Sequence, residues 1–206
     1  MVIQPAEAQT ISDELVEKFR EIDCASVADG VTGLGLNGVV QGLSPVNPKW
    51  KICGRAVTMR QVPLQEPDAW SHEGTDVASL ISICKPGDII VVDNGGRLDV
   101  AIFGGGSATK LKIFGIGGIV VDGACRDREE LLALDCPTYV RGVCLVHPQG
   151  LTHTVSVNTD VVQIGVAPMV ASVAPGDLIV GDMDGIVVVP ASRASEVLHL
   201  ATRPHS

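Results

Sequence analysis

Two short aliphatic runs near the middle of the chain, separated by a helical pattern, constrain its fold most strongly. DIIVVD (residues 88–93) and GGIVVDG (117–123) are typical of strands buried inside a sheet. SATKLKIF (107–114) lies between them and predicts a helix that is capped by Ser107. The chain is therefore expected to contain a buried sheet with helices packed against it.

Patterns along the rest of the chain predict a mixture of both elements. Helices are predicted over 12–22 with Ser12 as the cap, 24–31 after Asp23, 70–88 ending before Pro86, 127–134 and 192–201. Strands are predicted over 54–62 and 137–146, and a hairpin over 177–190 around Asp184-Gly185. The repeating strand–helix unit of a doubly wound sheet is missing at both ends. We therefore predict one α/β domain over residues 1–206, a layered sandwich with mixed strand directions.

Charge and composition disfavour several classes of protein. The formal net charge of −9 opposes nucleic-acid binding, because an acidic surface repels phosphates. No apolar run reaches the length of a membrane span, and the N-terminus shows no signal-peptide pattern. The cysteines form no C-x-x-C pair and lie mostly in apolar stretches, which indicates reduced thiols in a cytoplasmic protein. They are Cys24, Cys53, Cys84, Cys125, Cys136 and Cys144.

The glycine-rich stretch that ends at Ser107 matches neither common nucleotide-binding pattern. A P-loop needs glycine before its lysine, but Lys110 follows Thr109. A dinucleotide fingerprint would need glycine where Thr109 stands. The N–H groups at the start of the following helix could still bind a carboxylate. A plain tight turn explains the glycines equally well, and the residues alone leave both interpretations open.

Arg126 and Asp127 also allow two interpretations. Asp127 is placed to cap the helix of 127–134, and Glu130 would complete a capping box. The pair also follows a buried strand, where α/β sheets commonly bind ligands. Arg suits a carboxylate, and a neighbouring carboxylate suits Mg²⁺ with its waters. Taken alone, these residues favour the capping role.

The two pieces together, GGGSATKLKIFGIGGIVVDGACRD (104–127), resemble the RraA-like family, which includes class II 4-hydroxy-4-methyl-2-oxoglutarate and 4-carboxy-4-hydroxy-2-oxoadipate aldolases. Other segments resemble family patterns as well: IDCASVADGV, CGRAVTM, PGDIIVVD and PGDLIVGDMDGIVVVP. The resemblance implies a swivelling β/β/α sandwich. It also implies homotrimers or hexamers with the active site between subunits.

The resemblance further implies a divalent-metal-dependent lyase that cleaves a 4-hydroxy-2-oxo acid to pyruvate and also decarboxylates oxaloacetate. Gly104, Gly105, Gly106 and Ser107 would bind the substrate through backbone N–H groups. Arg126 would contact the 2-oxo acid end, and Asp127 would hold Mg²⁺ or Mn²⁺. The metal would act as a Lewis acid toward the developing enolate.

Two departures from the family pattern keep other functions open. The loop has glycine at positions 105 and 106 where family aldolases carry a bulkier or acidic residue, and Glu196 is the only acidic residue near the C-terminus. The alternatives are a protein-binding regulator of a ribonuclease, as the family's namesake is, or an enzyme for another 2-oxo acid. A methyltransferase is disfavoured because no S-adenosylmethionine loop follows the first strand. Five residues that could transfer protons are more simply turn or surface residues: Asp93, Asp182, Asp184, His147 and His153.

Overall fold

The computed structural model describes residues 11–66 and 75–203, and a mixed β-sheet forms the centre of this part of the chain. Neighbouring strands follow the order β1-β12-β11-β3-β4-β6-β7-β2, with β8 paired to β3 and β5 paired to β6. The strands are β1 (Val39–Val40), β2 (Ser44–Pro45), β3 (Ile52–Pro63), β4 (Ile89–Asp93), β5 (Ala101–Phe103), β6 (Gly118–Cys125), β7 (Thr138–Val143), β8 (Thr152–Val157), β11 (Leu178–Asp182) and β12 (Gly185–Val189). Pairing is parallel from β3 through β4 and β6 to β7, and antiparallel from β3 through β11 and β12 to β1.

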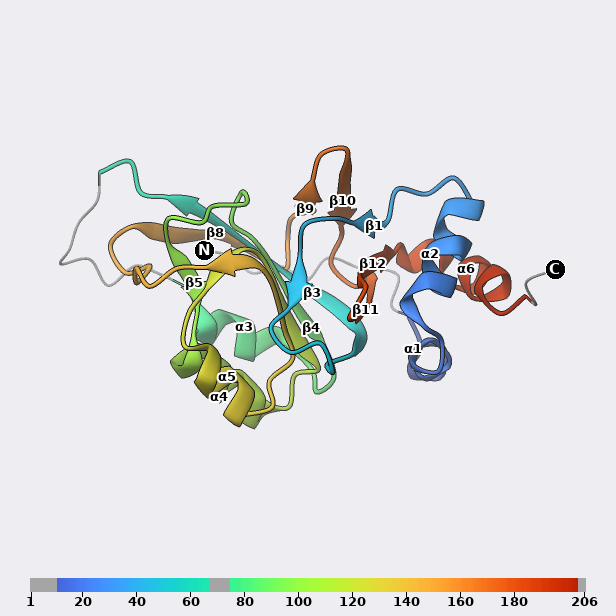
Figure 1. Cartoon of the computed structure of the whole chain (residues 1–206), viewed down its shortest axis with the longest axis horizontal. Coiled ribbons are helices and arrows are strands. Elements are labelled where there is room, and N and C mark those ends of the chain that lie inside the picture. Colours follow the sequence, from blue (N-terminus) through green and yellow to red (C-terminus); the bar gives the residue numbers. More distant parts are fainter. Residues whose placement is uncertain (1–10, 67–74, 204–206) are drawn as a thin grey trace.

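Two different layers cover the parallel part of the sheet (Figure 1). The helices α3 (Val77–Ile83), α4 (Gly105–Phe114) and α5 (Arg128–Ala133) pack on one face, where Leu80, Leu111 and Leu131 join the core. The hairpin of β9 (Val162–Val166) and β10 (Met169–Val173) covers the other face. This is the predicted β/β/α sandwich with mixed strand directions.

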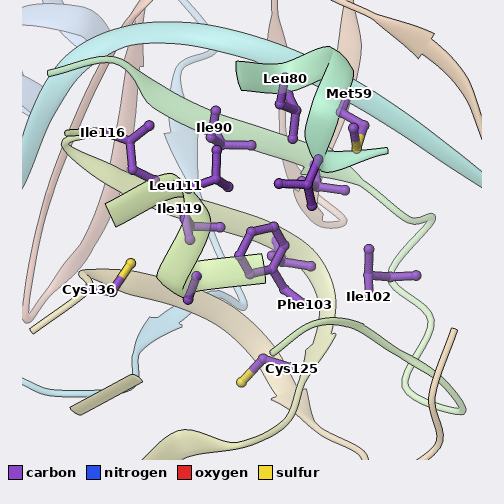
Figure 2. Packing of buried hydrophobic residues seen from close by; sticks show 14 of the residues in the cluster. Met59, Leu80, Ile90, Ile102, Phe103, Leu111, Ile116, Ile119, Cys125 and Cys136 are labelled. Carbon is purple, nitrogen blue, oxygen red and sulfur yellow. The ribbon is translucent and has the colours of Figure 1, made fainter. Parts of the chain in front are cut away.

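The double cover explains why the aliphatic runs of β4 and β6 show no polar alternation. In β4, Ile90 and Val92 face the helices, whereas Ile89 and Val91 face the hairpin. Figure 2 shows Ile90 and Ile119 next to Leu111 in the core on the helical side, which Leu80 also joins. Side chains of both orientations are therefore buried, as is usual for strands of a parallel sheet.

A separate group of helices packs on the antiparallel end of the sheet (Figure 1). α1 (Asp13–Arg20), α2 (Cys24–Gly33) and α6 (Ala194–Ala201), the last preceded by a 3₁₀ turn at Ala191–Arg193, contribute to a core shared with β11 and β12. Phe19, Val27 and Val197 are completely buried there. None of the helices in the described ranges is long and apolar enough to cross a membrane.

Several local predictions are confirmed. Ser12 caps α1 by accepting from the Leu15 N–H (3.3 Å), and Asp23 caps α2 by accepting from the Ser26 N–H (2.8 Å). The predicted hairpin is the β11–β12 pair, which turns between Asp182 and Gly185.

Other predicted boundaries are corrected or fall outside the described residues. α4 begins at Gly105 with Gly104 as its N-cap, so Ser107 lies inside the first turn and is not the cap. The strand predicted over 137–146 ends at Val143. The helix predicted over 70–88 is described from Val77 to Ile83, and its expected start at 70–74 lies outside the described residues.

Candidate active site

The glycine loop and the Arg-Asp pair meet because the strands that precede them are neighbours. β5 and β6 pair in parallel, so the segments that follow them leave the sheet at the same edge. Phe103 leads into Gly104 and α4, and Cys125 leads into Arg126 and Asp127. The Arg126 N–H donates to the Phe103 carbonyl at 2.9 Å. The two sequence pieces therefore form one continuous surface.

Glycine is required at two loop positions because side chains of the second segment lie against the backbone. A Cβ atom at position 104 would lie 2.6 Å from Asp127 Oδ2 and 3.0 Å from Arg126 Cγ. At position 105 it would lie 1.8 Å from Glu130 Oε2. The space that a side chain at residue 105 would fill is therefore taken by the carboxylate of Glu130. A Cβ atom at Gly106 would meet no heavy atom within 4 Å.

The side chain of Asp127 belongs to the loop and not to its own helix. Asp127 precedes α5 but has left-handed backbone angles (φ 57°, ψ 41°), and its carboxylate makes no capping hydrogen bond. Helix caps normally have extended backbone angles, which direct the side chain to the first N–H groups of the helix. Here Asp127 Oδ2 accepts from the Gly105 N–H at 3.2 Å instead. The predicted capping box of Asp127 and Glu130 is therefore wrong.

Arg126 is half-buried beside this carboxylate. Its Nε lies 3.3 Å from Asp127 Oδ2, and its side chain is 32% exposed. No other described side chain pairs with the guanidinium. An arginine fork of this kind, with N–H groups left for a ligand, suits a planar carboxylate.

The first turn of α4 supplies N–H groups to the same place. The first N–H groups of a helix have no partner within the helix. The Gly105 N–H is taken by Asp127, and the Ala108 N–H donates to the Gly104 carbonyl. This leaves the N–H groups of Gly106 and Ser107, and both residues line a cavity beside Arg126 and Asp127. The positive end of the α4 dipole favours an anion there.

The cavity has a volume of about 320 Å³, at the lower end of the size range of small-molecule sites (~300–1,000 Å³). Its walls come from the end of β5, the start of α4, the Arg-Asp pair, Thr75 and a loop after β7. His147, Pro148 and Gln149 form the part contributed by that loop. The sequence offered no signal for Thr75 or Gln149, whereas His147 was a candidate on chemical grounds alone.

The residues around the cavity fit an open divalent-cation site with a single protein carboxylate. The described part of the chain contains no group of three or more His, Cys, Asp or Glu residues that could enclose a metal. Asp127 is 37% exposed and lines the cavity, and only its Oδ2 atom is engaged by Gly105 and Arg126. Mg²⁺ is commonly held through one or two carboxylates, waters and substrate oxygens, so Asp127 fits this role.

The other acidic candidates have structural roles. Asp93 Oδ1 accepts from the Gly95 N–H (2.8 Å), as a turn residue does. Asp182 accepts from the N–H groups of Cys24 (3.1 Å) and Asp184 (2.9 Å), which fixes the β11–β12 turn to α2. Neither residue lines the cavity.

Two further side chains near the candidate site are excluded from its chemistry. His153 lies within β8, opposite Val62, and is not part of the cavity wall. Burial raises the pKa of the Cys125 thiol, so this residue next to Arg126 stays protonated and is not a nucleophile.

Comparison with known proteins gives a family assignment. A family model described as RraA-like, Aldolase/RraA, matches residues 11–188 of the chain. A protein of Halalkalibacterium halodurans, whose name proposes a 4-hydroxy-4-methyl-2-oxoglutarate aldolase, is 30% identical over 190 residues. That match covers 92% of this chain and 83% of the relative.

Two solved structures have the same fold over nearly the whole chain. One, from Streptomyces coelicolor, is described as an unusual member of the RNase ES inhibitor RraA protein family. Its TM-score is 0.79 and its sequence is 27% identical. The match covers 93% of this chain and 92% of the Streptomyces coelicolor chain. The other is an uncharacterised protein from Pseudomonas syringae pv. tomato, with a TM-score of 0.78 and 27% identity. This match covers 93% of this chain and 86% of the Pseudomonas syringae chain.

Proposed function

The chain belongs to the Aldolase/RraA family, and from this premise we propose that it is a divalent-metal-dependent lyase. It would cleave the C3–C4 bond of a 4-hydroxy-2-oxo acid to release pyruvate and would also decarboxylate oxaloacetate. The observation that carries the proposal is the side chain of Asp127, which turns away from α5 and lies against the Gly104–Gly105 backbone at the cavity. There the Gly105 N–H and Arg126 engage only the Oδ2 atom, which leaves Oδ1 for a cation.

The reaction develops negative charge on the substrate, and two groups of the chain can stabilise it: the Arg126 guanidinium and the N–H groups of the loop. The C4 hydroxyl loses its proton, the C3–C4 bond breaks to leave a carbonyl at C4, and the electron pair forms the pyruvate enolate. The enolate then takes a proton at C3. Arg126 would bind the carboxylate next to the keto group, and the N–H groups of Gly106 and Ser107 would donate to the oxygen on which charge develops.

Asp127 is the residue that would hold the cation, Mg²⁺ or Mn²⁺. When bound, such a cation supplies Lewis-acid stabilisation of the 2-oxo acid's oxygens. The Gly105 N–H and the Arg126 guanidinium fix the direction of the Asp127 carboxylate. The chain itself therefore places this carboxylate for the reaction.

The test is pyruvate release from 4-hydroxy-4-methyl-2-oxoglutarate and from oxaloacetate, coupled to lactate dehydrogenase. Turnover should require Mg²⁺ or Mn²⁺ and stop with EDTA. Asp127→Asn should abolish it, with a change of less than ~1 kcal/mol in unfolding free energy, because the side chain makes no capping bond to α5 and asparagine keeps an oxygen that can accept from the Gly105 N–H. Glu14→Gln is the matched control, since Glu14 is an exposed carboxylate paired with Lys18 in α1. Full activity in Asp127→Asn, or in EDTA, would contradict the proposal.

A protein-binding regulator of a ribonuclease is the second candidate. The likeness to the Streptomyces coelicolor structure, described as belonging to an RNase inhibitor family, favours it. A regulator should inhibit a purified ribonuclease in a titration, and Asp127→Asn should inhibit equally well. Inhibition that persists in this variant, together with no pyruvate release by the wild type, would select the regulator over the lyase.

We also propose that the protein is a homo-oligomer, a trimer or hexamer, with subunits that meet beside this site. Leu132, Val143 and Leu145 are exposed apolar residues. With Val46 they line a groove of about 570 Å³ that reaches Asp127. Light scattering coupled to size exclusion should show an oligomer that Leu145→Glu dissociates.

A further inference from the structure

His147 lies in a loop that the sheet holds against the cavity. The Cys144 N–H donates to the Cys125 carbonyl at 3.0 Å, which fixes the start of the loop to the end of β6. The Ala101 N–H donates to the Val146 carbonyl at 2.9 Å, which fixes the next part to β5. His147 follows immediately and forms part of the cavity wall. Its position is therefore set by the same two strands that position the loop and the Arg-Asp pair.

The hydrogen bonding of the imidazole decides which of its nitrogens can meet a ligand. The Gln149 N–H donates to His147 Nδ1 at 3.1 Å, so Nδ1 carries a lone pair. In the neutral ring the proton is then on Nε2. No described residue bonds to Nε2. The loop therefore presents an N–H donor, Nε2, at the cavity wall.

This arrangement argues against the role of proton acceptor that a histidine near an active site first suggests. To accept a proton at Nε2, the ring would have to carry one on Nδ1, where the Gln149 N–H already donates. A hydrogen-bond donor at Nε2 needs no such rearrangement. The ring is therefore suited to binding an acceptor oxygen of the ligand.

The geometry points to His147 as the residue that recognises the C4 end of the substrate: its Nε2 would donate a hydrogen bond to a carboxylate at that end. The inference rests on the proposed function for the orientation of the substrate. In that orientation, Arg126 and the N–H groups of Gly106 and Ser107 bind the 2-oxo acid end. The hydroxyl hydrogen of Thr75 is already used, because Oγ1 donates to the Ile102 carbonyl (2.6 Å). His147 is then a donor that is left for the other end of the ligand. Among 2-oxo acids, those with a second carboxylate are thus preferred over those with an alkyl end.

Two substitutions separate the donor role from a role in holding the loop. The side-chain amide of asparagine reaches the position of Nδ1, so His147→Asn keeps an acceptor for the Gln149 N–H but has no group at Nε2. The amide of glutamine reaches the position of Nε2, so His147→Gln keeps a donor there and loses the Nδ1 acceptor. His147→Ala removes both, and His147 is exposed enough for all three variants to fold.

The experiment measures binding of 2-oxoglutarate and of pyruvate by calorimetry, with Mg²⁺, for the wild type and the three variants. Neither ligand has a C4 hydroxyl, so the comparison does not depend on turnover. The wild type should bind 2-oxoglutarate at least tenfold more tightly than pyruvate, as expected for a hydrogen bond to a charged group. His147→Gln should keep this preference, and His147→Asn and His147→Ala should lose it.

The outcomes keep this inference apart from the proposed function. A preference that survives in His147→Asn but not in His147→Gln would show that His147 only holds the loop, and would overturn the inference. Equal affinities of the wild type for the two ligands would also overturn it. If the binding preference follows the donor while 4-hydroxy-4-methyl-2-oxoglutarate is not cleaved, the role of His147 stands and the lyase proposal fails.

Discussion

A single methyl group at Gly104 is expected to push the glycine loop away from the Asp127 carboxylate. A Cβ atom there would lie 2.6 Å from Asp127 Oδ2, whereas ordinary contacts begin at about 3.4 Å. The backbone itself is no obstacle, since Gly104 has an extended φ of −159° that alanine adopts readily. In Gly104→Ala, the loop and the carboxylate must therefore move apart by up to about 0.8 Å.

That displacement is sufficient to break the 3.2 Å hydrogen bond from the Gly105 N–H to Asp127. Misplacing a reacting group by about 1 Å costs on the order of a hundredfold in rate, or ~2.7 kcal/mol of transition-state stabilisation. We expect kcat/KM for pyruvate release to fall by about this factor. The unfolding free energy in urea should fall by only ~1–2 kcal/mol, since one partly exposed hydrogen bond is lost and alanine caps helices less well than glycine.

Gly33→Ala is the matched control, because Gly33 ends α2 at the antiparallel end of the sheet and does not line the cavity. A Cβ atom at Gly33 would lie 3.4 Å from Leu200 Cδ1, which is an ordinary contact. This variant should keep its activity and gain up to ~1 kcal/mol in stability. Wild-type kcat/KM in Gly104→Ala would refute the argument that the close approach of the loop to Asp127 positions the site.

Three further predictions concern the stability and chemistry of the fold. Arg141→Ala should lower the unfolding free energy, measured in urea, by roughly 3–5 kcal/mol, because the buried Asp122 would lose its partner. The Asp122 side chain is only 4% exposed, and its Oδ2 lies 2.9 Å from Arg141 Nη2. A loss under ~1 kcal/mol would contradict this. Burial raises the pKa of Asp177, so its contribution to stability is present below the unfolded pKa and is lost as pH rises through the folded pKa. Asp177→Asn should therefore cost less stability at pH 7 than near pH 4, as urea titrations at both values can show. A thiol reagent at pH 8 should modify the half-buried Cys144 first, whereas Cys24, whose pKa burial raises to about 12, should react only on unfolding; peptide mapping identifies the labelled sites.

Elements whose signals lie within one segment could be predicted from the sequence. The side chain of Asp23 caps α2 as its position suggests, and Asp184-Gly185 turns the β11–β12 hairpin. The start of α4 could not be predicted in this way. Its cap is Gly104, which has no side chain, and the N–H that a local cap would satisfy is bonded to Asp127 of another segment. The tertiary contact, and not a local residue, sets this boundary.

The failed capping box shows why the site needed both segments to be recognised. Asp127 and Glu130 have the spacing of a cap for α5, yet both carboxylates lie against the loop, at Gly104 and Gly105. α5 therefore starts without a side-chain cap, at a cost of about 1 kcal/mol. The fully buried Leu131 anchors the helix in spite of this.

Asp127 gives up a local hydrogen bond and adopts a left-handed backbone beside a cavity, and this observation motivates the proposal that it acts in the site. The glycine at 104 allows the Asp127 carboxylate to lie against the loop instead of capping α5, because any side chain at position 104 would occupy that space. An Arg-Asp pair after a strand is ambiguous by itself. Together with a glycine at 104, it places the Asp127 carboxylate against the loop in the cavity wall.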